Sequence, residues 1–251
     1  MLRLLRAPRW IVLGLMVVAV ASAFVRLGFW QLGRLEAKQR FNERFEARTA
    51  LPASDIIDLF PTPPAAAGEV AYRRATATGR FDTANEVLLQ SRSYKGSSGH
   101  HVLTSLVIAP GRALLVDRGW VPLDMNEPPI PEAAPPTEVT VQGVLFPSQA
   151  RGRFGPVEPP GPSRLRWRVD IARMQEQLPY AIYPLYLQLL EQQPPQPGEF
   201  PKLVTALPNL DEGPHRSYAV QWFSFAAMAV ISYLALAYRT SRRTPEPADA
   251  D

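Results

Sequence analysis

The chain of 251 residues contains no cysteine and only three histidines, His100, His101 and His215. Without cysteine it can form no disulfide, no thiolate metal site, no cysteine nucleophile and no thioether link to haem. It also lacks a G-x-S-x-G elbow, an HExxH helix and a G-x-x-x-x-G-K-[ST] phosphate loop. The signatures of a hydrolase, a zinc protease and a P-loop enzyme are therefore absent, and we expect no enzyme.

Lysine is also scarce, with three residues against 24 arginines, and the net charge is +4. An arginine-rich chain can bind nucleic acid, but that function needs basic residues that cluster or that interleave with aromatic residues. Here the arginines are spread along the whole sequence. We therefore expect no nucleic-acid partner.

Long uncharged runs occur near both ends of the chain. The first extends from Trp10 to Val25 and is followed by Arg26. At about 1.5 Å per residue, residues 10–30 would span roughly 30 Å, the thickness of one hydrocarbon core. Arg26 lies near one end, where its long side chain can reach the polar surface, and Trp10 and Trp30 bracket the run as interfacial aromatic residues.

A cleaved signal peptide is an alternative for this segment. Arg3, Arg6 and Arg9 form a basic amino-terminal region, and residues 21–23 (ASA) fit a small-residue cleavage pattern. However, the apolar run is somewhat long for a signal peptide, and the sequence pattern continues past the cleavage point without a break. We therefore prefer a retained helix.

The second run, Tyr218 to Tyr238, has no charged residue and is followed by Arg239, Arg242 and Arg243. It is the clearest membrane span of the chain. Two spans place both termini on one side of the membrane. Long loops cross membranes largely regardless of charge, so the short basic tails decide the orientation and place both termini in the cytoplasm.

We therefore expect a multi-pass protein of the cell (inner) membrane, whose large domain is extracytoplasmic. Its five predicted parts are a cytoplasmic tail (1–9), transmembrane helix 1 (10–30), an extracytoplasmic β-rich domain (31–214), transmembrane helix 2 (215–238) and a second cytoplasmic tail (239–251).

The segment between the spans has the features of a β-rich domain. Residues 34–49 alternate charged with apolar residues, which predicts that the first helix continues out of the membrane, and Pro-rich residues 59–69 predict a loop. Runs rich in Val, Leu, Thr and aromatic residues predict strands at 70–81, 86–94, 101–108, 112–122 and 138–146.

Shorter signals complete this prediction. Residues 109–112 have the pattern of a tight hairpin turn, and residues 170–178 predict a short helix. Residues 181–191 could form a strand or a helix, and Pro184 favours an edge strand. The chain has 27 prolines, most of them between the spans, which argues against a helical bundle. The predicted fold class is an α+β membrane protein, with two antiparallel transmembrane helices flanking a barrel-like or curved antiparallel sheet.

No catalytic constellation is evident in this domain. His100 and His101 begin a predicted strand, where adjacent side chains point to opposite faces, so we expect one of them to face solvent. A histidine metal cage would need all three histidines together with carboxylates. Asp117 has no evident acid–base partner, and Asp170 is best explained as the N-cap of the short helix.

The start of the second span is rich in polar and aromatic residues. On a helix, His215, Tyr218 and Trp222 share one face with Phe225 and Ala229, and Gln221 lies on an adjoining stripe about 9 Å deeper. Because the spans are antiparallel, the outer end of the first span should lie beside this face. Its residues are Arg26, Phe29, Trp30, Gln31 and Arg34.

Two interpretations of this region stay open. An imidazole beside aromatic rings and guanidinium groups suits a planar, amphipathic anion such as haem, whose iron takes imidazole and whose propionates pair with arginine. The alternative is an ordinary aromatic belt with a polar residue that reaches water.

Seven motifs follow one another between and around the two spans. They are LGFWQLGRLEAK (27–38), GRFD (79–82), HHVLTSL (100–106), LLVDRGWVP (114–122), WRVD (167–170), YPLYLQL (183–189) and HRSYAVQWFSFA (215–226). In this order they resemble the Surf1/Shy1 family, assembly factors for haem-copper cytochrome c oxidase. Ser105 stands where the family usually has Pro and Asp117 where Asn is common, departures that concern local turn geometry.

The resemblance implies two membrane helices around a domain outside the cytoplasm, and a role in the maturation of oxidase subunit I. Bacterial relatives have been associated with haem a, and the family's proposed haem ligand matches His215. In this hypothesis His215 is a transient metal ligand, the ring lies against aromatic residues, and arginines (Arg216, with Arg34 or Arg26) face the propionates. The candidate cofactor-binding residues are His215, Tyr218, Gln221, Trp222, Arg216, Trp30, Gln31 and Arg34.

The implied partners are cytochrome c oxidase subunit I and the lipid bilayer, with haem a synthase as a further candidate. The motif at 114–122 is better explained structurally, with Trp120 in the core and Arg118 paired with a buried carboxylate. Two rival functions stay open. One is a scaffold that docks oxidase subunits through its outer domain without a cofactor, and the other is a membrane-tethered enzyme acting on an envelope substrate.

Overall fold

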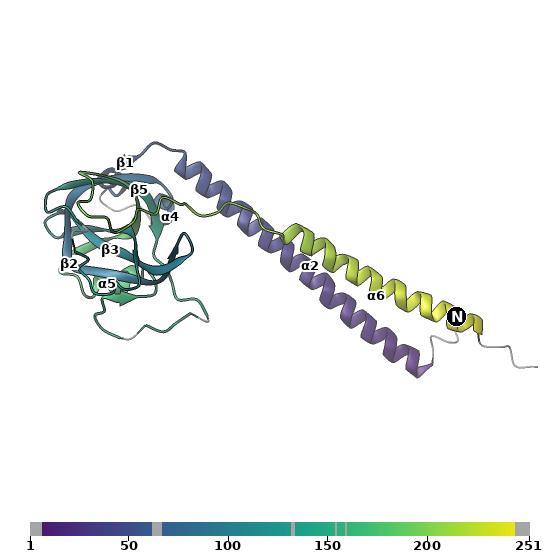
Figure 1. The fold of residues 1–251 in the computed structure, drawn as a ribbon. Coiled ribbons are helices and arrows are strands. Elements are labelled where there is room, and N and C mark those ends of the chain that lie inside the picture. Colours follow the sequence, from purple (N-terminus) through teal and green to yellow (C-terminus); the bar gives the residue numbers. More distant parts are fainter. Residues whose placement is uncertain (1–6, 62–66, 132–133, 154, 159, 244–251) are drawn as a thin grey trace, which may run out of the picture. The chain divides into compact units, whose positions relative to one another are not determined.

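The structure, a computed structural model, describes residues 7–61, 67–131, 134–153, 155–158 and 160–243. The chain divides into two compact units (Figure 1). The helix unit comprises Met1–Glu43 and Asn209–Asp251, and the β unit comprises Arg44–Pro208.

Two long helices dominate the helix unit. Helix α2 extends over Pro8–Thr49 and helix α6 over His215–Arg243. By length and composition both can cross a membrane, and only 6% and 11% of their apolar windows are buried, unlike core helices of a soluble protein. The 42 residues of α2 measure about 63 Å, twice a hydrocarbon core. The predicted continuation of the first helix through residues 34–49 is confirmed.

The two helices pack closely because small residues line their contact. A Cβ atom at Gly28 would lie 2.6 Å from the ring of Phe223, and one at Gly14 would lie 2.9 Å from the hydroxyl of Tyr233. Residue numbers rise along α2 as they fall along α6, so the helices are antiparallel, as predicted. Small residues at such a contact let helix backbones approach each other in a lipid environment.

The β unit contains a closed barrel. Its five long strands are β2 (Arg74–Tyr94), β3 (Ser97–Ala109), β4 (Arg112–Pro122), β5 (Val139–Pro147) and β7 (Ala181–Gln193). They pair in the order β2-β3-β4-β7-β5, and β5 pairs again with β2. All these pairs are antiparallel except β4 with β7. The prediction of a barrel-like β-rich domain is confirmed, as a mixed sheet rather than a purely antiparallel one.

Short elements complete the unit. They are the strands β1 (Ser54–Asp55) and β6 (Leu165–Arg166), which pair with β2, and the helices α3 (Ile56–Leu59), α4 (Ala67–Val70) and α5 (Ile171–Gln175). Asp170 caps α5 by accepting a hydrogen bond from the backbone N–H of Arg173, as predicted. The hairpin turn at 109–112 is also confirmed, since β3 and β4 join through Pro110 and Gly111, whose φ is 77°.

Three local predictions need correction. Val70 belongs to helix α4, so the first strand begins at Arg74. The runs 70–81 and 86–94 form one strand, which bends at an irregularity between Asp82 and Val87. The loop predicted at 59–69 is shorter than expected, because Leu59 ends α3 and residues 67–69 belong to α4, and residues 62–66 lie outside the described residues.

Pro184 does not mark an edge strand, because β7 lies between β4 and β5. The proline is accommodated because the β4–β7 register shifts around it, and β5 pairs with β7 only from Leu185 onwards.

Apolar side chains fill the barrel and cover one outer face. One cluster gathers residues from β2, β3, β4, β5 and β7, including Leu106, Leu114 and Leu187. A second cluster packs α5 against the sheet through Ile171 and Met174. The barrel thereby supplies a rigid frame for the polar groups described next.

Candidate functional site

The residues before α6 fix the position of His215. Lys38 donates a hydrogen bond to the backbone carbonyl of Asn209 at 2.6 Å, and Gln39 donates one to Glu212 at 2.9 Å. These contacts hold segment 209–214 along α2. The carbonyl of Pro214 then accepts the first helical bond, from the N–H of Tyr218. These contacts therefore fix which residues of α2 lie beside His215, the first residue of α6.

His215 is hydrogen-bonded to Gln31 across the helix pair. Its Nδ1 lies 2.8 Å from Oε1 of Gln31. An amide oxygen only accepts hydrogen bonds, so with this orientation of the amide the Nδ1 of His215 carries the proton. In the neutral ring Nε2 then holds a free lone pair, the form of imidazole that binds a metal.

Trp222 packs into an aromatic cluster between the helices. Its ring stacks on Phe24 at 5.6 Å and meets Phe225 edge-on at 5.9 Å, and Phe24 lies 5.8 Å from Phe225. The cluster is seven residues, or two helical turns, along α6 from His215. Trp222 therefore packs between the two helices and stabilises the end of the helix pair that carries the imidazole.

The structure brings together only part of the predicted site. Tyr218 is 47% exposed and does not share the contact face of His215, because the neighbouring Ala219 is buried there. A small residue at this position lets the helices approach and turns Tyr218 outwards. Trp30 is 57% exposed. The remaining predicted residues, Gln221, Arg216 and Arg34, are exposed as well.

Arg26 joins two apolar grooves on the helix unit. One groove, of about 440 Å³, is lined by Ala23, Arg26, Leu27 and Trp30. The other, of about 590 Å³, contains Arg26 with apolar residues of α2 and Val230. Leu27 is one turn from Gln31, so the first groove adjoins the stripe that carries the imidazole contact. A charged residue inside an otherwise apolar run is the sequence signal for this feature.

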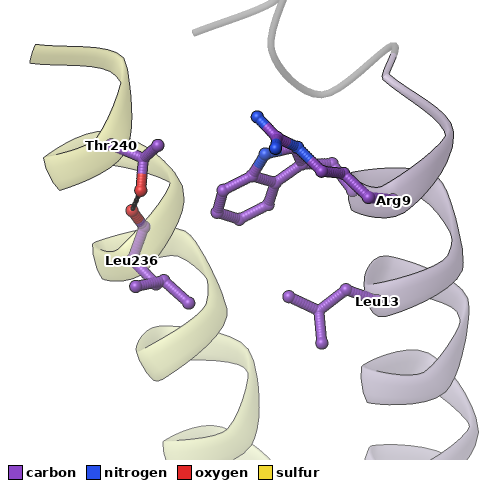
Figure 2. Close-up of a pocket in the computed structure, with 5 residues that line it drawn as sticks. Arg9, Leu13, Leu236 and Thr240 are labelled. Carbon is purple, nitrogen blue, oxygen red and sulfur yellow. Dashed lines mark hydrogen bonds between the residues drawn. The ribbon is translucent and has the colours of Figure 1, made fainter. Parts of the chain in front are cut away.

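A different cavity lies at the opposite end of the helix unit (Figure 2). Its volume is about 340 Å³, and it is lined by Arg9, Trp10, Leu13, Leu236 and Thr240. Trp10 is held there because its ring packs on Tyr233, whose hydroxyl donates to the Trp10 carbonyl. None of the predicted cofactor-binding residues lines this cavity.

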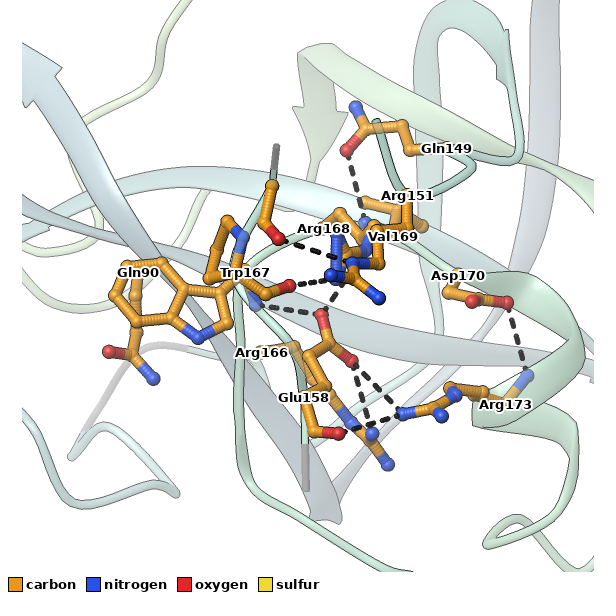
Figure 3. Close-up of polar contacts among 12 residues, drawn as sticks. Gln90, Gln149, Arg151, Glu158, Arg166, Trp167, Arg168, Val169, Asp170 and Arg173 are labelled. Atoms are coloured by element: carbon orange, nitrogen blue, oxygen red, sulfur yellow. Dashed lines mark hydrogen bonds and ion pairs between the residues drawn. The ribbon is translucent and has the colours of Figure 1, made fainter. Parts of the chain in front are cut away.

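In the β unit, one carboxylate lies among three arginines (Figure 3). The side chain of Glu158 is 1% exposed and lies 3.2 Å from Arg166, 3.5 Å from Arg168 and 4.0 Å from Arg173. It also accepts a hydrogen bond from the backbone N–H of Trp167. The motif at 167–170 therefore contributes Arg168 and the backbone N–H of Trp167 to a structural ion cluster that has more positive than negative charge.

A second buried ion pair confirms the structural explanation of the motif at 114–122. Arg118 is fully buried, 3.7 Å from Glu86 and over the ring of Phe81. Burial lowers the pKa of Arg118 to about 10, an effect that Glu86 opposes, and burial raises the pKa of Glu86. Trp120 is buried in the same region, as predicted.

The two adjacent histidines both lie in polar surroundings that the sequence did not reveal. His101 forms a 2.8 Å hydrogen bond with Asp117, and neither side chain is exposed. His100 is 8% exposed. The expectation that one of them faces solvent was therefore wrong, since His100 is buried and His101 is held against Asp117 of the neighbouring strand β4. Asp117 does have a histidine partner, which lies on the neighbouring strand β3.

Known proteins place this chain in a family. The model of the SURF1 family matches residues 18–227. The chain belongs to the SURF1 family. An uncharacterized SURF1-like protein of Mycobacterium tuberculosis is 32% identical over 249 residues, covering 96% of this chain and 89% of the relative. A SURF1-like protein of Monosiga brevicollis is 27% identical over 239 residues, covering 88% and 87%. The SURF1 family is associated with cytochrome oxidase assembly.

Proposed function

We propose that this protein is a membrane-anchored assembly factor for haem-copper cytochrome c oxidase that holds haem a transiently during maturation of subunit I. Membership of the SURF1 family supports the assembly role. One observation carries the cofactor role: the hydrogen bond from His215 to Gln31, which leaves Nε2 of the imidazole free to bind a metal.

The residues present suit a haem. When bound, haem a would supply an iron that takes one imidazole nitrogen and propionates that pair with guanidinium groups. His215 offers the imidazole, and Gln31 fixes its tautomer and ring orientation. Trp30 and Leu27 offer an apolar wall, and Arg26 offers a positive charge between the two apolar grooves. Arg34 and Arg216 are further exposed cations near the same helix ends.

The openness of this arrangement suits release as well as binding. His215 is only half-buried, and we assign it as a single protein ligand rather than one of two. A site with one imidazole and an open side can pass its cargo to another protein more readily than a closed two-ligand site. The protein residues therefore bind and orient, and the proposal assigns them no catalytic step.

The proposal includes a membrane topology. Residues 10–30 and 215–238 would cross the cell membrane, residues 31–214 would lie outside the cytoplasm, and both tails (1–9 and 239–251) would lie inside. His215 would then be at the outer leaflet. Subunit I of the oxidase is the proposed recipient, with haem a synthase as the donor.

The test uses the full chain produced together with haem a and purified in detergent. The unmodified protein is expected to show a Soret band that His215→Ala removes or shifts. Gln31→Leu should weaken retention about tenfold, because loss of the group that orients a metal-binding histidine typically costs that much. His100→Gln and His101→Gln are matched controls and should leave the band unchanged.

An unchanged band in the His215→Ala protein would disprove the ligand role. Two results together would favour the scaffold function instead. The purified protein would never carry haem a, and a strain that lacks the protein would make an oxidase that keeps its haem but fails to assemble. In that outcome the family role survives and the cofactor role does not.

A further inference from the structure

An irregularity in the barrel creates a cavity in the β unit. The β2–β3 pairing is regular from Val87 opposite Leu103 to Leu89 opposite His101, and it resumes at Arg92 opposite Gly99. Between these pairs, Gln90 and Ser91 on β2 face the single residue His100 on β3, which is the geometry of a β-bulge. A bulge bends its strand and re-aims nearby side chains.

The bulge is held in an uncommon backbone conformation. Ser91 has φ of 55°, in the left-handed region that residues other than glycine seldom adopt. Strained residues of this kind persist where the surroundings over-determine them, and they cluster at ligand sites. Here the neighbouring Arg92 holds the bulge, because its guanidinium donates to the carbonyl oxygens of Gln90 at 3.0 Å and Trp167 at 3.1 Å.

The cavity beside the bulge has a volume of about 320 Å³. Its lining includes Ser91, Arg92, Ser93, Ser98, His100 and Leu123. Three hydroxyl groups, one guanidinium and one imidazole therefore surround a space large enough for a small metabolite. It lies wholly within the β unit and shares no residue with the proposed haem site.

His100 is the main unexplained group in this cavity. It is 8% exposed, and its Nδ1 is buried without a hydrogen-bond partner among the residues that the structure describes. Burial lowers the pKa of His100, which favours the neutral ring. A bare acceptor nitrogen is less costly to bury than an unpaired N–H donor, so the proton belongs on Nε2. The ring then offers one donor.

Arg92 adds a positive charge to the same cavity. In the described part of the chain its guanidinium hydrogen bonds all go to backbone carbonyl oxygens, and no carboxylate lies within ion-pair distance of it. Carbonyl dipoles do not neutralise a full charge. An uncompensated guanidinium beside hydroxyl groups and an N–H donor is a setting that favours an anion.

We infer that the bulge cavity binds a small anion through a carboxylate or phosphate group, held by Arg92, His100 and the serine hydroxyls of β2 and β3. The ligand class is a small organic phosphate or carboxylate. Arg92 would supply the charge and His100 one directional hydrogen bond. This inference does not depend on haem binding, and it gives the β unit a ligand site of its own.

The test observes the imidazole rings of the full chain in detergent micelles by nitrogen-detected NMR after labelling histidine alone. With three histidines, each ring can be assigned by replacing the other two in turn. The probes are inorganic phosphate and succinate, each titrated to about 10 mM, ten times a Kd of about 1 mM. A saturable shift of the His100 ring with at least one probe, and none of His215, is expected. The two arms distinguish a phosphate site from a carboxylate site.

Arg92→Gln should weaken this binding about tenfold or more. Arg80→Gln is the matched control, because Arg80 lies on the same strand, is exposed and does not line the cavity. If neither probe shifts the His100 ring in the unmodified chain, the inference is wrong. Equal affinity for the anion in the Arg92→Gln and Arg80→Gln proteins would also overturn the inference. Because the first measurement uses the unmodified chain, the inference can be tested even if a variant fails to fold.

Discussion

The β unit and the helix unit differ in how deeply their charged and polar groups are buried and in how many partners these groups have. In the β unit, Glu86 accepts hydrogen bonds from Thr104 and from the backbone of Ile130, and it faces the buried Arg118. Glu158 is held by three arginines and a backbone N–H. Both carboxylates, Glu86 and Glu158, are buried and have several partners each, so they serve the fold.

In the helix unit, by contrast, the His215 ring has one side-chain hydrogen-bond partner among the described residues, Gln31, and is only half-buried. Arg26 has no ion-pair partner among the described residues and lies between two open apolar grooves. A charged or polar group inside an apolar helical segment lowers stability unless it has partners, so such a group without partners in the fold is a candidate for binding. The number of hydrogen-bond and ion-pair partners of a charged or polar group therefore distinguishes groups that stabilise the fold from groups that are candidates for binding.

The largest expected effect comes from the most buried charge pair. Glu86→Gln leaves Arg118 fully buried without its counter-charge, and breaking a buried pair by removing one partner costs about 3–5 kcal/mol. The free energy of unfolding, measured by chemical denaturation of the full chain in micelles, checks this value. The double variant Glu86→Gln/Arg118→Met should recover much of the loss, because it leaves no unpaired buried charge. If the single variant lost less than about 1 kcal/mol, Glu86–Arg118 would not be a structural pair.

The Glu158 cluster should respond less. Glu158→Gln removes the carboxylate that pairs with three arginines in the described part of the chain, but Arg173 is partly exposed and can turn to water. We expect a loss of about 2 kcal/mol in the same measurement. Glu199→Gln is the control, since Glu199 pairs with Lys202 at the surface, where such pairs contribute about 0–1 kcal/mol. Equal losses in the two variants would contradict the distinction between buried and exposed clusters.

Sequence patterns predicted the elements of both units better than their partners. The five strand runs and the long first helix could be predicted because hydrophobic period and turn residues act locally. Arg118 could be assigned to a buried carboxylate, but Glu86 lies 32 positions away on another strand, and only the barrel register brings the two together. Pro184 misled for the same reason, since the register shift that accommodates it depends on two neighbouring strands.

The candidate site in the helix unit was predictable in outline for a simpler reason. Two antiparallel helices leave few choices of neighbour, so Gln31 and His215 could be expected at the same end. What the pattern could not give was the rotation of α6. Tyr218 lies three residues and Ala219 four residues after His215, so either could share its face of the helix. Close packing of the two helices places the smaller residue, Ala219, at the contact.

A third prediction concerns this close packing. Gly28→Leu places a side chain where a Cβ atom already lies 2.6 Å from the Phe223 ring, so the helices must separate. Overpacking of this kind costs about 1–3 kcal/mol. Because the chain has no cysteine, spin labels can be attached at Leu32→Cys and Ser217→Cys, and their distance distribution should broaden and lengthen. Gly33→Leu is the matched control, as nothing lies within 4 Å of its Cβ position. An unchanged distribution in Gly28→Leu would show that the glycine does not set the helix contact.

The smallest expected effect is a pH dependence of the β unit, and it tests whether His100 is a structural or a binding group. Burial lowers the pKa of His100, so the folded protein holds the neutral ring while the unfolded chain protonates near pH 6.5. The unfolded state therefore binds more protons below that value, and stability is lost as pH falls through it. His100→Gln should flatten this loss between pH 7.5 and 5.5, a difference limited by about 1.4 kcal/mol for each unit of pKa change. The same loss in His100→Gln and in the unmodified chain would mean that other groups control it.

Added phosphate or succinate, if it binds beside His100 and Arg92, should reduce the acid sensitivity of the unmodified chain and leave that of His100→Gln unchanged, because an anion in the cavity favours the protonated ring.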